Sequence, residues 1–153
     1  MRTIKFRGKK KSGEWLYGDL MHYCGATLIL PLDANWYDFV PKKDNPFRLP
    51  SSKFEVDPDT VGLFTGLHDK NGKEIYEGDI VSHPWKDPIF GDLVETGQFV
   101  HSTICFNNGA FVVNYRLQGE YIYLQDFVRL KCLEVVGNIH DNPELIKKGG
   151  DNA

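Results

Sequence analysis

Apolar and polar residues alternate with a period of two along most of this chain, and this pattern predicts short β-strands. Near the start, residues 3–7 alternate in this way, and residues 15–21 follow as the second strand of a hairpin after a glycine-containing turn. A third apolar run at 27–32 ends in a proline-containing segment. The first part of the chain is therefore predicted to be a β-hairpin followed by one more strand.

Residues 33–55 break this pattern and are predicted to form a long loop. Three prolines interrupt the segment, yet it also carries aromatic side chains, among them those of Trp36, Tyr37, Phe39 and Phe47. A loop of this length with aromatic residues is typical of a partner-binding or lid segment. The alternative is an arm that packs over its own barrel, and the sequence leaves both interpretations open.

The middle of the chain predicts a second hairpin. Residues 60–67 have a strand pattern, Asn71-Gly72 follows, and a new strand begins at Asp79. Asn-Gly tolerates positive φ at both central positions of a two-residue turn, which makes it a strong hairpin signal.

The remaining sequence predicts five short strands with a helical turn before the last. Such a series matches an SH3-like, partly open β-barrel, and only residues 144–147 add a short C-terminal helical turn. We therefore expect a mainly β fold in a single domain over 1–148, with a frayed tail at 149–153. Within it, 1–55 would form the N-terminal hairpin and aromatic loop arm, and 56–140 the barrel-like core. The strands are predicted at 93–101, 102–107, 110–115, 121–124 and 133–138, and the helical turn at 125–129.

The composition is that of an ordinary globular domain. The chain has 153 residues, of which 41% are hydrophobic and 25% are charged, and a domain of this size folds without a disulfide or a metal. The three cysteines are scattered, and Cys105 and Cys132 lie in apolar runs typical of buried thiols. No apolar run approaches the length of a membrane span, and the basic start lacks the apolar stretch of a secretory signal. We expect a cytoplasmic protein without membrane contact.

The charge is distributed unevenly. Residues 1–53 hold 10 Lys/Arg and 5 Asp/Glu, whereas residues 54–153 hold 8 and 16. Arg7, Lys9, Lys10 and Lys11, together with Arg2 and Lys5, could form a basic stripe that contacts phosphates. The overall isoelectric point of about 5.9 favours the alternative, a solvated turn whose charge attracts the acidic half of the same or another copy.

Reactive side chains form no recognisable catalytic pattern. The five histidines lack the spacing of metal ligands, and no nucleophile motif or phosphate-binding glycine loop is present. The strongest candidate is a cluster of three carboxylates after the second hairpin, those of Glu74, Glu77 and Asp79. Combined with His68 or His83, they could form a small hydrolase site. A turn whose aspartate accepts backbone N–H bonds is the alternative. We predict no catalytic residue, no metal site and no cofactor.

Three separated segments resemble one known family. They read IKFRG at 4–8 with WLYG at 15–18, then VDPDTVG at 56–62 with TGLHDKNGKEIYEGDIV at 65–81, and VVGNIHDNPEL at 135–145. In this order they are similar to the YopX family of phage and prophage proteins, over residues 2–146. The departures are small: Leu63-Phe64 stands where the family tends to have a polar residue and Tyr, and His140 where Tyr is usual.

The resemblance implies a mainly β fold and a life in the cytoplasm of a bacterium that carries a phage or prophage, with no catalytic residues to transfer. Our leading hypothesis is a non-catalytic binding or assembly module that contacts a protein partner or itself as a homo-oligomer. The alternative is a nucleic-acid-binding regulator that uses the basic hairpin. The candidate contact residues are Arg7, Lys9, Lys10, Lys11, Trp36 and Tyr37.

Overall fold

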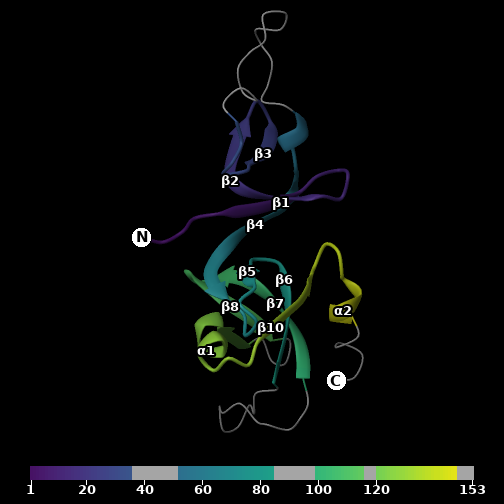
Figure 1. Ribbon diagram of the computed structural model, residues 1–153. Coiled ribbons are helices and arrows are strands. Elements are labelled where there is room, and N and C mark those ends of the chain that lie inside the picture. The colour runs from purple at the N-terminus through teal and green to yellow at the C-terminus, as the bar shows by residue number, and fades with distance from the viewer. Residues whose placement is uncertain (36–51, 85–98, 116–119, 148–153) are drawn as a thin grey trace, which may run out of the picture. The chain divides into compact units, whose positions relative to one another are not determined.

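The computed structural model of the chain describes residues 1–35, 52–84, 99–115 and 120–147. These residues form two five-stranded antiparallel sheets with a few short helices and no closed barrel, which confirms the predicted mainly β, partly open fold (Figure 1). The first sheet has the strand order β3-β2-β1-β4-β5 and the second β10-β6-β7-β8-β9. The strands are β1 (Phe6–Lys9), β2 (Trp15–Tyr23), β3 (Ala26–Leu30), β4 (Asp57–His68), β5 (Glu74–Tyr76), β6 (Asp79–Pro84), β7 (Phe99–Asn107), β8 (Ala110–Tyr115), β9 (Glu120–Tyr123) and β10 (Glu134–Asn138).

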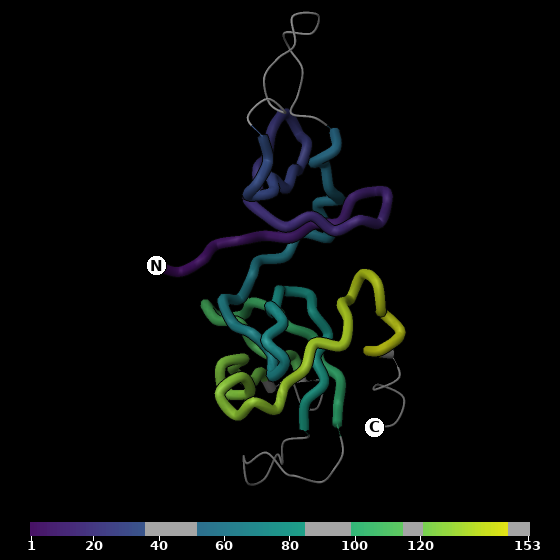
Figure 2. Tube along the Cα trace, viewed as in Figure 1, coloured from purple at the N-terminus to yellow at the C-terminus, as the bar shows by residue number. Residues whose placement is uncertain are grey.

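The chain divides into two compact units, and the division falls inside a strand. The first unit is Met1–Phe64 and the second is Thr65–Ala153, so the chain passes from one to the other along β4 (Figure 2). We expected the N-terminal part to end at residue 55. The division lies later because the first half of β4 pairs with β1 and so belongs to the first unit. The second half leads to β5, which continues the same sheet beyond β4.

The first unit is built on β1. This strand pairs with β2 on one side and with β4 on the other, and β2 in turn pairs with β3. An isolated bridge between Leu28 and Glu55 joins β3 to the chain just before β4. The strands approach closely here, since a Cβ on Gly8 would lie 2.7 Å from Val56 Cγ2 and 3.1 Å from Ile29 Cγ1. Close approach of backbone to side chain explains the glycine at this position.

The first strand starts later than its sequence pattern predicts. It covers Phe6–Lys9 and not residues 3–7, because pairing with both neighbours begins at Phe6, which lies opposite Gly18 and Leu63. The Lys5 carbonyl still accepts a hydrogen bond from the Phe64 amide at 2.8 Å. Thr3 and Ile4 therefore keep the alternation of a strand without belonging to any strand that the structure describes.

The second unit contains the larger core. Helix α1 (Leu124–Arg129) follows β9 and contributes Leu124 and Phe127, which are both buried. They pack with apolar side chains of the second sheet and of β5. The predicted helical turn at 125–129 is thus confirmed, as is the short C-terminal helix α2 (Glu144–Lys147). The rest of this core consists of Ile75, Val81, Ile104, Val113, Ile122, Leu133 and Val135.

Two predicted strands are one strand in the structure. Residues 99–107 form the continuous strand β7, not separate strands at 93–101 and 102–107. β6 pairs with Phe99 to Thr103 and β8 pairs with Thr103 to Asn107, so each half of β7 has a partner and no turn is needed between them. Residues 93–98 lie outside the described part of the chain.

The two Asn-Gly pairs form different turns. Between β7 and β8, Asn108 has φ 49° and Gly109 φ 79°, which is the expected two-residue hairpin with positive φ at both positions. At Asn71-Gly72 only Gly72 has positive φ, at 82°. There the Gly72 amide donates to the Asp69 carbonyl at 3.0 Å, and the Asp69 amide to the Lys73 carbonyl at 2.8 Å. The predicted hairpin is present, but our expectation of positive φ at Asn71 was wrong.

The predicted aromatic loop arm lies almost wholly outside the described residues. Its last part forms a short 3-10 helix, η2 (Ser52–Phe54), whose Phe54 is buried. Trp36, Tyr37, Phe39, Phe47 and the tail at 149–153 fall in undescribed segments. In the described part of the chain, no helix is long and apolar enough to cross a membrane.

Candidate interaction surface

The Asp69 carboxylate is used to hold two parts of the second unit together. Its Oδ1 accepts hydrogen bonds from the amides of Asn71 at 2.8 Å and Lys73 at 2.9 Å, and its Oδ2 accepts one from the Val135 amide at 3.0 Å. Burial raises the pKa of this carboxyl, but the three amide donors and the Lys73 charge outweigh it, so the pKa lies below its usual range. Asp69 therefore joins the β4–β5 turn to β10.

The carboxylates of the alternative hydrolase site also have structural contacts. Asp79 is buried and accepts the Tyr76 amide at 2.8 Å, as expected for a turn aspartate, while the Tyr76 hydroxyl donates to Glu74 at 2.9 Å. Asp79 and His83 lie near opposite ends of β6, about 13 Å apart at the usual strand rise. Direct proton exchange between these two groups is thus out of reach.

His83 and Ser102 form a buried hydrogen-bonded pair. His83 Nδ1 lies 2.8 Å from the Pro84 carbonyl oxygen, which can only accept, so Nδ1 carries the proton. Nε2 then accepts from the Ser102 hydroxyl at 2.9 Å. This is the donor order of a serine nucleophile and its base. However, the exposed fractions of His83 and Ser102 are 0% and 3%, so a substrate has no access to the hydroxyl.

The surroundings of His83 favour its neutral form. Burial lowers its pKa, the bond to the Pro84 carbonyl raises it to a lesser extent, and the charge of His101 lowers it again. The ring also packs on Phe127, with 4.6 Å between the two centroids. We interpret the pair as a satisfied polar contact within the core.

The thiols and possible metal ligands give no further site. Burial raises the pKa values of Cys105 and Cys132, so both favour the unreactive thiol form. Cys24 is exposed in the turn between β2 and β3. Over the described ranges, no three His, Cys, Asp or Glu side chains gather in a group that could hold a metal ion.

The basic residues of the first unit do not form one uniform stripe. Arg7 is buried, with its guanidinium 4.9 Å from the centre of the Trp15 ring. Lys10 makes an ion pair with Glu14 at 2.9 Å, and Lys11 is exposed in the turn between β1 and β2. Lys9 is half-buried at the end of β1, where its amide donates to Thr60 Oγ1. Trp36 and Tyr37, the two aromatic candidates, lie outside the described residues.

The outer face of the second sheet carries exposed aromatic side chains. The basic candidate residues of the first unit form no such surface. Ile104, Val113 and Ile122 lie opposite one another across β7, β8 and β9 and point into the core. The alternate residues Tyr121 and Tyr123 point to the other side, where 51% and 57% of their surface is exposed. We call this surface the β9 face. It consists of Tyr121 and Tyr123 with the half-buried Asn114 on β8 and Thr103 and Cys105 on β7, whereas Val112, opposite Tyr123, is buried.

The β9 face borders a sheet edge. β9 ends the strand order of the second sheet, so only β8 pairs with it among the described strands. An edge strand offers unpaired amide and carbonyl groups to another extended chain, and proteins often protect such edges with Lys or Pro. β9 reads Glu-Tyr-Ile-Tyr and contains neither. The edge thus combines a side without a partner among the described strands with two exposed aromatic side chains.

Comparison with known proteins agrees with this two-sheet antiparallel β class. The model of the YopX protein family matches residues 5–147, nearly the whole chain, and the chain belongs to that family. A crystal structure of protein EF1440 from Enterococcus faecalis is similar in fold, with a TM-score of 0.51 and 21% sequence identity over 95% of this chain and 99% of that one. No curated protein matches.

Tyr121 and Tyr123 are not among the contact residues predicted from the sequence. Aromatic residues of an exposed face and of a β core have the same appearance in sequence. The signal was nevertheless present, because Tyr-Ile-Tyr places both tyrosines on the face opposite Ile122. The pattern alone could not show which of the two faces was buried.

Proposed function

We propose that this protein is a non-catalytic binding module of phage or prophage origin that assembles with a protein through the β9 face. The observation that carries the proposal is the pair of exposed tyrosines on the strand that ends the second sheet among the described strands. Tyrosine is enriched at protein interfaces because it offers a large apolar area together with a polar tip. We further propose that the protein acts in the cytoplasm of the bacterium that carries the phage genes.

The internal use of the polar groups supports a binding role over a catalytic one. Asp69 and Asp79 bind backbone amides, and His83 binds Ser102 and a carbonyl oxygen, all in buried positions. A catalytic acid or base has to reach its substrate to within hydrogen-bond distance. These three groups support the fold instead.

The experiment is a capture of partners from a lysate of a bacterium that carries the gene. The tagged protein is compared with Tyr121→Lys/Tyr123→Lys and with the matched control Tyr23→Lys, which replaces a similarly exposed tyrosine on β2. We expect a protein partner that survives nuclease and high salt, is lost with the double substitution and is kept with the control. A partner that all three forms capture equally would contradict the proposed surface.

The same experiment tests the nucleic-acid alternative. A nucleic acid held by the basic turn would be lost at moderate salt, because phosphate contacts depend steeply on ionic strength. Lys9→Glu/Lys10→Glu/Lys11→Glu would abolish it, whereas the tyrosine substitutions would leave it unchanged. That result would replace the protein-binding proposal.

A further inference from the structure

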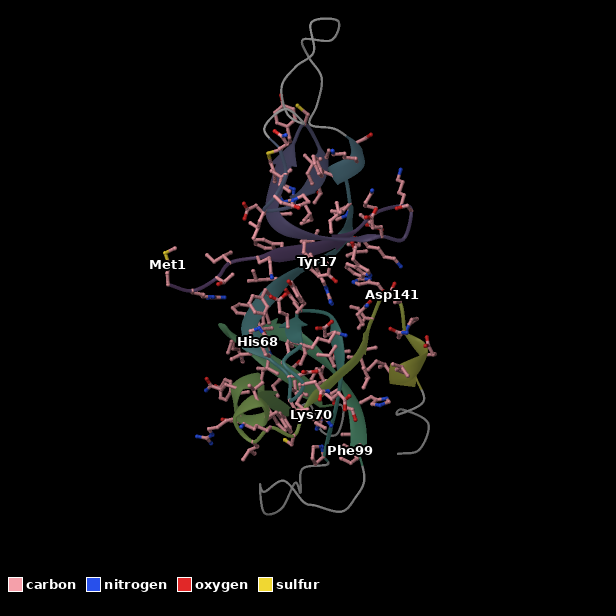
Figure 3. All side chains as sticks on the ribbon, in the orientation of Figure 1. Met1, Tyr17, His68, Lys70, Phe99 and Asp141 are labelled. Carbon is pink, nitrogen blue, oxygen red and sulfur yellow. The ribbon has the colours of Figure 1, made fainter. Side chains whose placement is uncertain are left out.

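The first four residues of the chain precede β1 and pair with no strand that the structure describes. Thr3 and Ile4 continue the alternating pattern of β1, yet residues 1–4 lie outside every described strand, and 63% of the Ile4 surface is exposed. Figure 3 shows Met1 at the outer end of this segment. We call residues 1–4 the N-terminal arm. An extended segment with an exposed isoleucine gains both hydrogen bonds and apolar burial when it joins a sheet edge.

The β9 edge has complementary features. β9 and the arm each have four residues, and β9 lacks a neighbour on one side among the described strands. The charges are also opposite: the arm carries Arg2 and is followed by Lys5, whereas residues 65–153 hold 13 Asp/Glu and 8 Lys/Arg. Opposite charge of this kind steers association and fixes its orientation.

The other sheet edges are less available to the arm. The outer side of β10 is occupied by the turn at Asp69, through the Val135 amide and through the Lys70 amide, which donates to the Leu133 carbonyl. β3 bridges to Glu55, and β5 has only three residues. Among the edges that the structure describes, β9 is thus the one that combines four residues with two exposed aromatic side chains.

We propose that the N-terminal arm of one copy adds to β9 of a second copy as an antiparallel strand, and that reciprocal exchange closes a dimer. In this register Ile4 lies opposite Tyr121, and Arg2 opposite Tyr123. Ile4 then covers one tyrosine ring, and the guanidinium of Arg2 meets the other as a cation–π pair. Thr3 lies opposite Ile122 on the core side. The inference deepens the proposed function, since it names a second copy as an occupant of the β9 face.

The mass of the protein in solution tests the dimer. We expect the unaltered protein to dimerise, and we expect deletion of residues 2–4 or Tyr121→Lys/Tyr123→Lys to weaken dimerisation by roughly a hundredfold. Lysine on an edge strand opposes further pairing, and here it would also repel Arg2. Tyr23→Lys, the control, keeps the dimer. An unaltered protein that is monomeric at all concentrations, or an arm deletion that stays dimeric, would overturn the proposal.

A cysteine experiment tests the register and the exchange between copies. In a Cys24→Ser background, one chain carries Ile4→Cys and a second, differently tagged chain carries Tyr121→Cys. Residues opposite each other in an antiparallel pair lie within the Cα separation that a disulfide bridges. We expect an intermolecular disulfide from this mixture but little from Thr3→Cys with Tyr121→Cys. If the double variant Ile4→Cys/Tyr121→Cys instead closes the disulfide within one monomeric chain, exchange between copies is wrong.

The arm deletion also separates this proposal from the proposed function. It leaves Tyr121 and Tyr123 in place, so a bacterial partner that binds the β9 face should still be captured, and more readily if the arm competes for the face. Lost dimerisation with retained capture supports both proposals. A dimer that survives arm deletion removes the arm exchange but leaves the capture result to decide the binding role.

Discussion

The two edges of the second sheet are built in opposite ways. At β10 the turn after β4 covers the strand through the Asp69 carboxylate, and Lys70 and Asn71 both contact Glu134, at 2.8 and 3.2 Å. At β9 the outermost strand carries two exposed tyrosines. In this fold, polar contacts close the β10 edge, whereas the β9 edge is suited to association.

The β10 edge is expected to lose the most stability when Asp69 is replaced. Asp69→Ala removes the acceptor of three backbone amides, including the buried amide of Val135, and should lower the free energy of unfolding by about 3 kcal/mol. Urea denaturation measures this change. The control Asp59→Ala removes an exposed aspartate near the start of β4 and should change stability by less than about 0.5 kcal/mol.

The contribution of Asp69 should depend on pH. Its pKa is lower in the folded than in the unfolded chain, so the unfolded state binds the proton first as the pH falls. The stability that Asp69 adds is therefore fully present near pH 7 and is lost as the pH falls below about 4. The difference in unfolding free energy between the protein and Asp69→Ala should shrink over that range; a constant difference would mean that the ionised carboxylate is not what holds the edge.

The bulge in β10 should show a smaller effect. The pairing of β10 with β6 shifts between Val135 and Gly137, and a Cβ on Gly137 would collide with the Asn142 side chain, at 2.8 Å from its Cγ. Gly137→Ala should lower stability by about 2 kcal/mol, as overpacking does. Thermal unfolding is measured for Gly137→Ala, Asn142→Ala and the double variant, which together form a double-mutant cycle. The double variant should lose less stability than the sum of the two single losses. Simple additivity would show that the collision is relieved elsewhere.

The β9 edge should show the smallest stability change. Tyr121→Lys/Tyr123→Lys alters exposed side chains and should change the free energy of unfolding of the monomer by no more than about 0.5 kcal/mol per site. Denaturation at a protein concentration below the dimer range measures it. A loss as large as that of Asp69→Ala would mean that the tyrosines support the fold and that the two edges do not differ in the way described.

Local pattern was sufficient for most of the strands and helices. The hairpin at Asn108-Gly109 follows from its turn residues, and the helical turn after β9 and the C-terminal helix were likewise predicted from residues near in sequence. The start of β1 and the continuity of β7 were predicted incorrectly, because they depend on where partner strands begin and end. Asn71 likewise keeps negative φ because the Asp69 carboxylate shapes that turn from both sides.

By itself, the sequence determined the mainly β class, the family and the alternation that places Tyr121 and Tyr123 on one face of a strand. Only the tertiary structure decided that this face is exposed, that β9 is an edge, and that Asp69, Asp79 and His83 point into internal contacts. The reason is physical. Periodicity comes from the geometry of a single strand, whereas burial and edge position depend on which distant strands pair and pack around it.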